Sequence, residues 1–166
     1  MQEVLPNVYL GPFQVARVNS TLRANKITLL IPVRTPNTVR FLATPNDENG
    51  QPWSAFPVDI QHDQIMGWFY KTYLRVKEEV EKGGRIFIYC ENGNGLSAAI
   101  CVALVMDTRL YVHVQCKCVN FRWDYRTARE FVQTKRYSID IPDWARFSLE
   151  VLSSESKLIV AISTAC

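Results

Sequence analysis

The stretch from residue 85 to residue 106 constrains the fold of this chain more than any other. Residues 85–90 are an apolar run rich in Ile and Phe that indicates a buried strand, and residues 97–106 indicate a buried helix. The polar turn between them contains Gly93 and Gly95, which permit a tight, concave backbone. The N–H groups of such a loop and of a first helical turn lack intrahelical partners, so the sequence predicts an anion site here.

Cys90 closes the predicted strand and lies at the mouth of this loop. The dipoles that attract an anion also favour a thiolate, so a nucleophilic cysteine is one interpretation. A structural cysteine at the end of a buried strand is the other. The glycine loop and the helix behind it favour the nucleophile.

The loop resembles the signature of cysteine-dependent protein phosphatases, in particular the dual-specificity class. That signature is His-Cys, five residues, Arg, then Ser or Thr, with a glycine third after the cysteine. Tyr89 stands at the histidine position and Leu96 at the arginine position. The resemblance implies a phosphate-binding loop formed by Glu91, Asn92, Gly93, Asn94, Gly95 and Ser97, of which Gly93 and Ser97 match the signature together with Cys90.

Asp59 lies 31 positions before Cys90. The resemblance places the general acid of the dual-specificity phosphatases at this spacing, and a carboxylic acid facing a cysteine loop can protonate a leaving oxygen. The structural alternative is a carboxylate that caps a loop or a helix start, and it stays open.

Leu96 removes the cation on which phosphatase chemistry depends. The thiolate attacks phosphorus, and the charge on three phosphoryl oxygens is held by loop amides and the bidentate fork of the arginine. By analogy, an arginine that stabilises phosphoryl transfer is worth about 10³–10⁵ in rate. Tyr89 cannot supply a positive charge, and Glu91 adds a negative charge beside the thiol. Arg34 and Arg122 are possible replacements from other loops.

These departures resemble those of the pseudophosphatases of the phosphoserine/threonine/tyrosine-interacting type, whose usual change is at the cysteine. The resemblance covers residues 3–152 and implies an inactive phosphatase-like domain that acts as a protein-interaction, scaffold or regulatory module, with phosphorylated partners as one option. The alternative is a weakly active phosphatase with Cys90 as nucleophile and Asp59 as general acid. A third option is a purely structural subunit.

The remaining pattern predicts an α/β fold with a central, mostly parallel sheet flanked by helices. An amphipathic helix between two strands, closed by Gly83-Gly84, indicates a βαβ unit. We expect strands at residues 4–12, 27–33, 53–60 and 85–90, with an optional strand at 39–43, and helices at 13–24, 64–82, 97–106, 124–136 and 141–152. Pro32 suggests that its strand ends nearby. The domain prediction is a phosphatase-like domain over residues 1–152 and a tail over 153–166.

Two segments have no counterpart in the family pattern. Residues 112–121 form an insertion in which Cys116, Cys118 and His113 are too few for a structural zinc site, so apolar packing or a partner surface is expected. The apolar residues 158–162 are open to three interpretations: a packed strand, a partner-binding segment or a disordered end. Lys135 and Arg136 are expected to complement the end of their own helix rather than a ligand.

Composition limits the remaining possibilities. The chain has 166 residues, 48% of them hydrophobic and 21% charged, as in a globular protein. A net charge of +3 argues against broad nucleic-acid binding. We expect no metal, no cofactor and no membrane segment, and protein partners, while the oligomeric state stays open. Five cysteines without a secretory signal predict reduced thiols and a cytoplasmic or nuclear location.

Overall fold

A central sheet carries the fold in the computed structural model of the chain. The structure describes the backbone of residues 1–61, 64–107 and 123–163, and the side chains of these residues up to 154. The strands are β1 (Gln2–Leu5), β2 (Val8–Pro12), β3 (Leu29–Arg34), β4 (Val58–Asp59) and β5 (Ile86–Cys90). The helices are α1 (Phe13–Ala16), α2 (Asn19–Ala24), α3 (Ile65–Glu81), α4 (Leu96–Met106), α5 (Tyr125–Lys135) and α6 (Asp143–Ser163).

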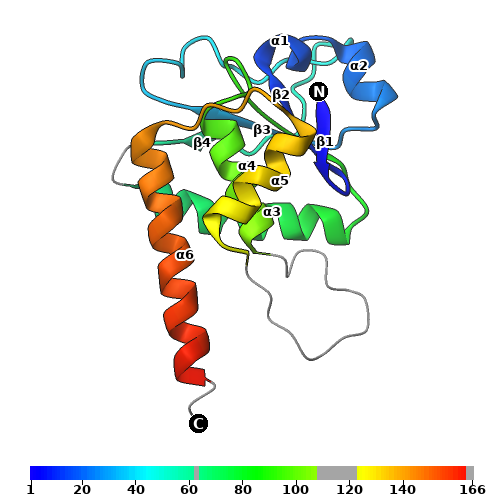
Figure 1. Cartoon of the computed structure of the whole chain (residues 1–166). Helices are drawn as coiled ribbons and strands as arrows, with labels where there is room; N and C mark the ends of the chain where they lie inside the picture. Colours follow the sequence, from blue (N-terminus) through cyan, green and yellow to red (C-terminus); the bar gives the residue numbers. More distant parts are fainter. Residues whose placement is uncertain (62–63, 108–122, 164–166) are drawn as a thin grey trace.

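Strand β5 lies in the middle of this sheet. The order is β1-β2-β5-β3-β4, with β1 antiparallel to β2 and the other neighbouring pairs parallel. The side chains of β5 alternate between two apolar cores, as the period of a strand requires. Ile86, Ile88 and Cys90 join the core shared with α3, α4, α5 and α6, while Phe87 and Tyr89 join the core shared with α1 and α2. Figure 1 shows α4 and α5 in front of the sheet. The predicted mixed, mostly parallel α/β fold is confirmed.

Helix α4 is buried along its whole length, from Leu96 to Met106. Its sequence is apolar on every side, as expected of a helix that packs between a sheet and outer helices. Helices α5 and α6 both contact it. The carboxyl end of β5 and the start of α4 are therefore fixed by the core on both sides of the loop.

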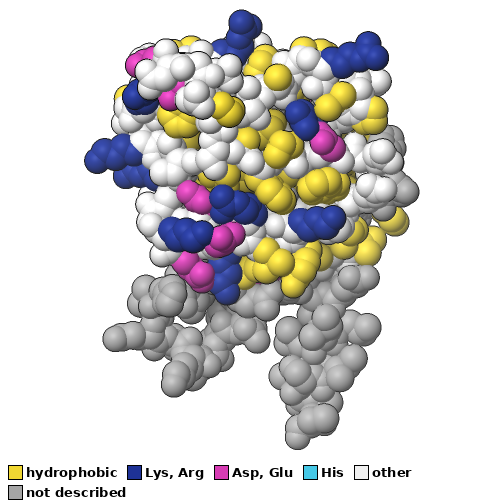
Figure 2. Space-filling view, turned by 180° about the vertical axis from the view of Figure 1, so that it is seen from behind, with side chains coloured by type: hydrophobic (Ala, Val, Ile, Leu, Met, Phe, Trp, Pro, Cys, Tyr) yellow, Lys and Arg dark blue, Asp and Glu magenta, His cyan; other side chains and the backbone are white. Residues whose placement is uncertain are grey.

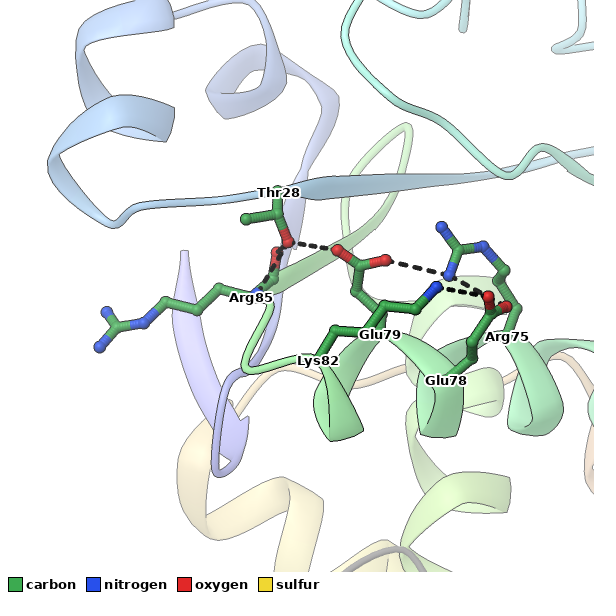
Figure 3. A network of polar contacts seen from close by, with 6 residues as sticks. All are labelled: Thr28, Arg75, Glu78, Glu79, Lys82 and Arg85. Carbon is green, nitrogen blue, oxygen red and sulfur yellow. Dashed lines mark hydrogen bonds and ion pairs between the residues drawn. The ribbon is translucent and has the colours of Figure 1, made fainter.

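A polar network joins α3 to the amino-terminal end of β5 (Figure 3). The Thr28 hydroxyl lies 2.6 Å from Glu79 Oε1 and accepts a hydrogen bond of 2.9 Å from the backbone N–H of Arg85. Arg75 in turn pairs with Glu79 at 3.0 Å. A side chain at Gly84 would collide with Glu79 and Thr28, so the predicted Gly-Gly turn is also required by packing.

The segment between β3 and α3 differs from the prediction. Residues 39–43 contain turn, bend and irregular backbone, so the optional strand there is absent, and within residues 53–60 only Val58–Asp59 is a strand. Leu30 and Arg34 bond this segment through their backbones, and Pro32, which faces the same edge, has no N–H to donate. The pairing is therefore interrupted beside Pro32, which lies inside β3 and does not end it.

Two helix predictions also need correction. The expected helix over residues 13–24 is broken into α1 and α2, because Val18 has an extended backbone. The last helix does not end at residue 152 but continues to Ser163, so the strand option for residues 158–162 is wrong. Helix α5 begins as predicted, with the Asp124 carboxylate accepting a hydrogen bond of 2.8 Å from the N–H of Thr127. No described helix is both long enough and apolar enough to cross a bilayer.

Candidate functional site

The loop between β5 and α4 is the candidate site. Cys90 ends β5 and is 9% exposed, so its sulfur is buried at the base of the loop. The sulfur lies 2.9 Å from the hydroxyl oxygen of Ser97, which is fully buried in the first turn of α4. A hydroxyl at this distance can donate to a thiolate or to the sulfur of a leaving thiolate. The structure therefore brings Cys90 and Ser97 together, as the sequence predicts.

In the described part of the chain, four loop carbonyls accept hydrogen bonds, those of Glu91, Asn92, Asn94 and Gly95, whereas the loop amides donate none. Glu91 O accepts from the Phe13 N–H at 3.2 Å, Asn94 O from the Asp140 N–H at 2.9 Å, and Gly95 O from the Ala99 N–H at 2.9 Å. Among the described residues, no backbone N–H between positions 92 and 97 donates to a protein acceptor. A run of unpaired N–H groups at the start of a helix is an anion-binding arrangement.

Gly93 permits the sharp turn of this loop. Its φ is 70°, and a side chain there would overlap the backbone of Gly11 and Pro12 at the end of β2. Glycine is required by both conditions. The glycine predicted from the spacing therefore has a physical reason in this fold.

Leu96 occupies the first position of α4, at 9% exposure, and packs in the core with Cys90. Its side chain offers neither a hydrogen-bond donor nor a charge. Among the described residues, no arginine side chain takes the place of the signature arginine at position 96. The loop thus has amides for an anion but lacks the cation that the signature would supply.

The carboxylate of Asp59 forms an ion pair with Arg34. Its two carboxylate oxygens accept hydrogen bonds from Arg34, at 2.6 Å from Nε and 2.9 Å from Nη2. Asp59 ends β4 at the edge of the sheet, and β3 lies between β4 and the strand that carries Cys90. No contact between Asp59 and Cys90 occurs among the described residues. The pair also occupies Arg34, which the sequence left open as a replacement cation.

Tyr89 faces the core opposite to Cys90. Its ring stacks on Phe13 and Phe87, with centroids 6.1 and 5.3 Å apart. Its hydroxyl is buried and has no hydrogen-bond partner among the described residues. Burial raises the pKa of this phenol well above its ordinary value, although the positive charge of Arg34 opposes the shift. Tyr89 is therefore neutral and cannot replace a histidine cation.

Arg136 is the residue of this site that the sequence reasoning placed elsewhere. Its guanidinium donates three hydrogen bonds: Nε to Asn94 Oδ1 at 2.8 Å, Nη1 to Gln2 Oε1 at 2.6 Å, and Nη2 to Asn92 O at 2.9 Å. These bonds go to the loop and to β1, and not to the end of its own helix, where the sequence favoured them. The contact joins residues 42 positions apart, and no local pattern in a single sequence indicates it.

Cys101 is a second buried thiol behind the loop. It is fully buried one turn after Ser97 and is free, as is Cys90. Burial and the nearby Cys90 raise the pKa of Cys101 far above its ordinary value, and the charge of Arg136 opposes this shift. Cys101 is thus a neutral packing residue.

The described residues contain no cluster of metal-ligating side chains. The candidate set Cys116, Cys118 and His113, the insertion 112–121 and Arg122 lie outside the described residues. The predictions for these residues therefore stay predictions.

Comparison with known proteins identifies the class. No family model matches the chain. Human dual specificity protein phosphatase 1 is 31% identical over 158 residues, which are 95% of this chain but 38% of that protein. Human serine/threonine/tyrosine-interacting protein is 28% identical over 145 residues, 84% of this chain and 58% of that protein. The chain therefore spans less than two thirds of these curated relatives.

Solved structures agree with these matches. The crystal structure of human tyrosine phosphatase-like serine/threonine/tyrosine-interacting protein has a TM-score of 0.76 at 26% identity and covers 97% of both chains. Human DUSP28, at 19% identity and a TM-score of 0.74, covers 94% of both chains and supports the fold alone.

The class is thus a phosphatase-like domain of the dual-specificity fold. More particularly, the homologues of this chain are dual-specificity phosphatases and the serine/threonine/tyrosine-interacting protein. The resemblance predicted from the loop is confirmed.

Proposed function

We propose that this chain is a catalytically inactive phosphatase-like domain that acts as a protein-interaction module, with phosphorylated partner segments as ligands of the Cys90 loop. One observation carries the proposal: the position of the catalytic cation is taken by Leu96, which is packed into the core. The named activities of the relatives belong to those proteins, and only the loop and fold are shared here.

Two groups needed for turnover are absent or engaged: the arginine, replaced by Leu96, and the carboxylate of Asp59. Loss of a charge-stabilising arginine costs about 10³–10⁵ in phosphoryl-transfer rate, which is about 4–7 kcal/mol of barrier. A general acid typically contributes about 10²–10⁴, and the carboxylate of Asp59 is bonded to Arg34. Together these losses would leave little turnover.

The unpaired amides of residues 92–97 support a retained anion ligand. An anion at a helix start needs N–H donors and the dipole, both of which this loop keeps. The loop therefore keeps the donors for anion binding although it has lost a group needed for catalysis. Leu96 in place of arginine removes one strong contact to the anion but leaves the amide donors.

The surface opposite to that of Figure 1 supports a protein partner. Figure 2 shows apolar side chains across the middle of that face, with both signs of charge around them. Helix α3 separately exposes Tyr70 by 65% and Leu74 by 46%. Apolar surface with mixed charge suits a protein better than a polyanion. A cytoplasmic or nuclear location is part of the proposal, and the free Cys90 and Cys101 are in keeping with it.

A weakly active phosphatase is the second candidate. The 2.9 Å contact between Cys90 and Ser97 favours it, because this contact can stabilise a nucleophilic or leaving sulfur. In that case the amides alone would hold the transferred group.

Hydrolysis of an aryl phosphate by the purified protein tests the proposal. We expect wild type to match the Cys90→Ser background and Leu96→Arg to exceed it, since the arginine restores the missing fork. Ser148→Ala, whose hydroxyl donates to Trp144 O at 3.1 Å within α6, controls for the handling of variants. Turnover by wild type above the Cys90→Ser background would establish the second candidate instead.

A further inference from the structure

We infer that Arg136 is a positioning residue for the binding of a tetrahedral oxyanion at the Cys90 loop, holding the loop amides in their inward-facing arrangement from the far side of the loop. The inference rests on the proposed function and goes beyond it, since it names the residue that maintains the site after the loss of the arginine at position 96.

Three bonds from one planar group fix the loop. The Arg136 guanidinium reaches the Asn92 carbonyl, the Asn94 side chain and Gln2 at the start of β1. A peptide unit has its carbonyl and the following N–H on opposite sides, so a carbonyl of the loop that is bonded outward turns the next amide inward. Arg136 therefore orients the N–H that follows Asn92, at Gly93.

Asn94 is bonded twice to the segment after α5. Its side-chain oxygen accepts from Arg136, and its backbone oxygen accepts from the Asp140 N–H at 2.9 Å. The same geometric argument turns the N–H of Gly95 inward. Two outward carbonyls of the loop, at Asn92 and Asn94, are thus held by Arg136 and by the N–H of Asp140.

Among the described residues, Arg136 has no ion-pair partner. The ion pairs of the described residues include Arg34 with Asp59 but none with Arg136. Its charge lowers the pKa of the amino terminus and opposes the rise in the pKa of Cys101. A positive field therefore reaches the buried base of the loop, and it favours an anion there.

Charge and positioning make different predictions for a lysine. Lysine keeps the positive charge but has no planar fork, so it cannot reach Asn92, Asn94 and Gln2 together. A residue that orients ligating groups from behind, by analogy with metal sites, is worth about 10- to 100-fold in affinity.

The experiment is calorimetric titration of the full chain with sodium tungstate, with ¹H–¹⁵N spectra to locate the ion. Wild type is compared with Arg136→Ala, Arg136→Lys and Asn94→Ala. Arg129→Ala is the matched control, because Arg129 lies on α5, the helix that Arg136 follows, and donates to Gln133 at 3.3 Å rather than to the loop. Thermal unfolding of every variant is measured alongside.

We expect tungstate to shift the amide signals of residues 92–97 in wild type and in Arg129→Ala. Arg136→Ala should weaken binding by about tenfold or more, with smaller losses in Arg136→Lys and Asn94→Ala. The loss should appear well below the unfolding temperature, which a purely structural role would not produce.

Three results would overturn the inference. Equal affinity of Arg136→Ala and wild type removes the role of Arg136 and leaves the proposed function intact. Equal affinity of Arg136→Lys and wild type shows that charge, not positioning, is the contribution. No tungstate binding by wild type removes the inference together with the anion-binding part of the proposed function. If Arg136→Ala does not fold, Asn94→Ala decides, and an unchanged affinity there overturns the inference.

Discussion

Gly93 has the tightest backbone surroundings in the loop between β5 and α4. Its φ of 70° is costly for other residues, and a methyl group there would overlap the backbone of Gly11. We predict that Gly93→Ala lowers the free energy of unfolding by about 3 kcal/mol or more, since strain and overlap act together. Urea denaturation measures the change.

Gly83 provides the control for this prediction. Its φ is 75°, but nothing lies within 4 Å of the position that a methyl group would take. Gly83→Ala should therefore cost only the strain, about 1–2 kcal/mol. Equal losses in the two variants would show that the loop moves away from Gly11.

Tyr89 carries a hydroxyl that costs stability. A buried hydroxyl without a partner costs about 1–3 kcal/mol, so Tyr89→Phe should leave the protein as stable at neutral pH or more stable by about 1 kcal/mol. Tyr9→Phe is the matched control, because its hydroxyl lies 3.4 Å from Arg85 Nη1. A clear loss of stability in Tyr89→Phe would reveal a partner for this hydroxyl.

The same residue predicts a dependence of stability on alkaline pH. The pKa of Tyr89 is raised on folding, so the unfolded chain loses the phenol proton first as the pH rises. The contribution of the protonated Tyr89 phenol to the free energy of unfolding is fully present below the ordinary phenol pKa of 10.0. It is lost progressively as the pH rises above that value. Cys101, whose pKa is also raised, adds a fall from above about pH 9. Denaturation at several pH values should show a shallower alkaline decline in Tyr89→Phe; an unchanged decline would contradict the assignment.

Among the elements, the contact between α3 and the β3–β5 pair depends on Thr28. Its hydroxyl contacts Glu79 and accepts from the Arg85 N–H, so Thr28→Val leaves both groups short of a partner. We predict a loss of about 0.5–1.5 kcal/mol, because water can replace the partners of these exposed hydrogen bonds. Thr72→Val on α3 is the isosteric control, because the buried Thr72 hydroxyl has no partner among the described residues. Equal changes in the two variants would show that the network in Figure 3 adds no stability.

Elements with a strong local pattern were predictable from the sequence. The apolar run before Cys90, the apolar helix after it and the Asp124 cap each depend on neighbours within a few residues, and each was found where expected. Residues 53–60 were not, because their pairing depends on the missing N–H of Pro32 in another strand. The break at Val18 and the extension of α6 likewise follow from no clear local signal.

The candidate site divides in the same way. Cys90, Gly93 and Ser97 are close in sequence, and their arrangement follows from the strand–loop–helix pattern. The Arg34–Asp59 pair spans 25 positions and the Arg136–Asn94 bond spans 42, and each depends on how strands and helices are placed in the whole fold. Composition and hydrophobic periodicity do not predict contacts between residues so far apart in the sequence.

At the scale of the whole molecule, two features depart from phosphatase chemistry: the missing arginine at position 96 and the Arg34–Asp59 ion pair. They lie at the carboxyl ends of different strands of the sheet. Leu96 follows β5, while Asp59 and Arg34 end β4 and β3. A restored arginine at position 96 would not by itself free Asp59. We therefore predict that the turnover of Leu96→Arg is nearly independent of Asp59, so that adding Asp59→Asn changes it by less than about threefold, well below the contribution of a working general acid.

Adding Arg34→Gln to Leu96→Arg should release the Asp59 carboxyl from its bidentate partner. The double variant should then gain about tenfold or more in turnover of an aryl phosphate with a poor leaving group, because protonation of that oxygen becomes available. The gain should vanish when Asp59→Asn is added. Substrates with good leaving groups need no protonation, so they serve as the control and should show little gain. Asp59→Asn could instead abolish the turnover of Leu96→Arg while Arg34 is intact. That result would show that the ion pair opens during the reaction and that the missing arginine at position 96 alone explains the lack of activity.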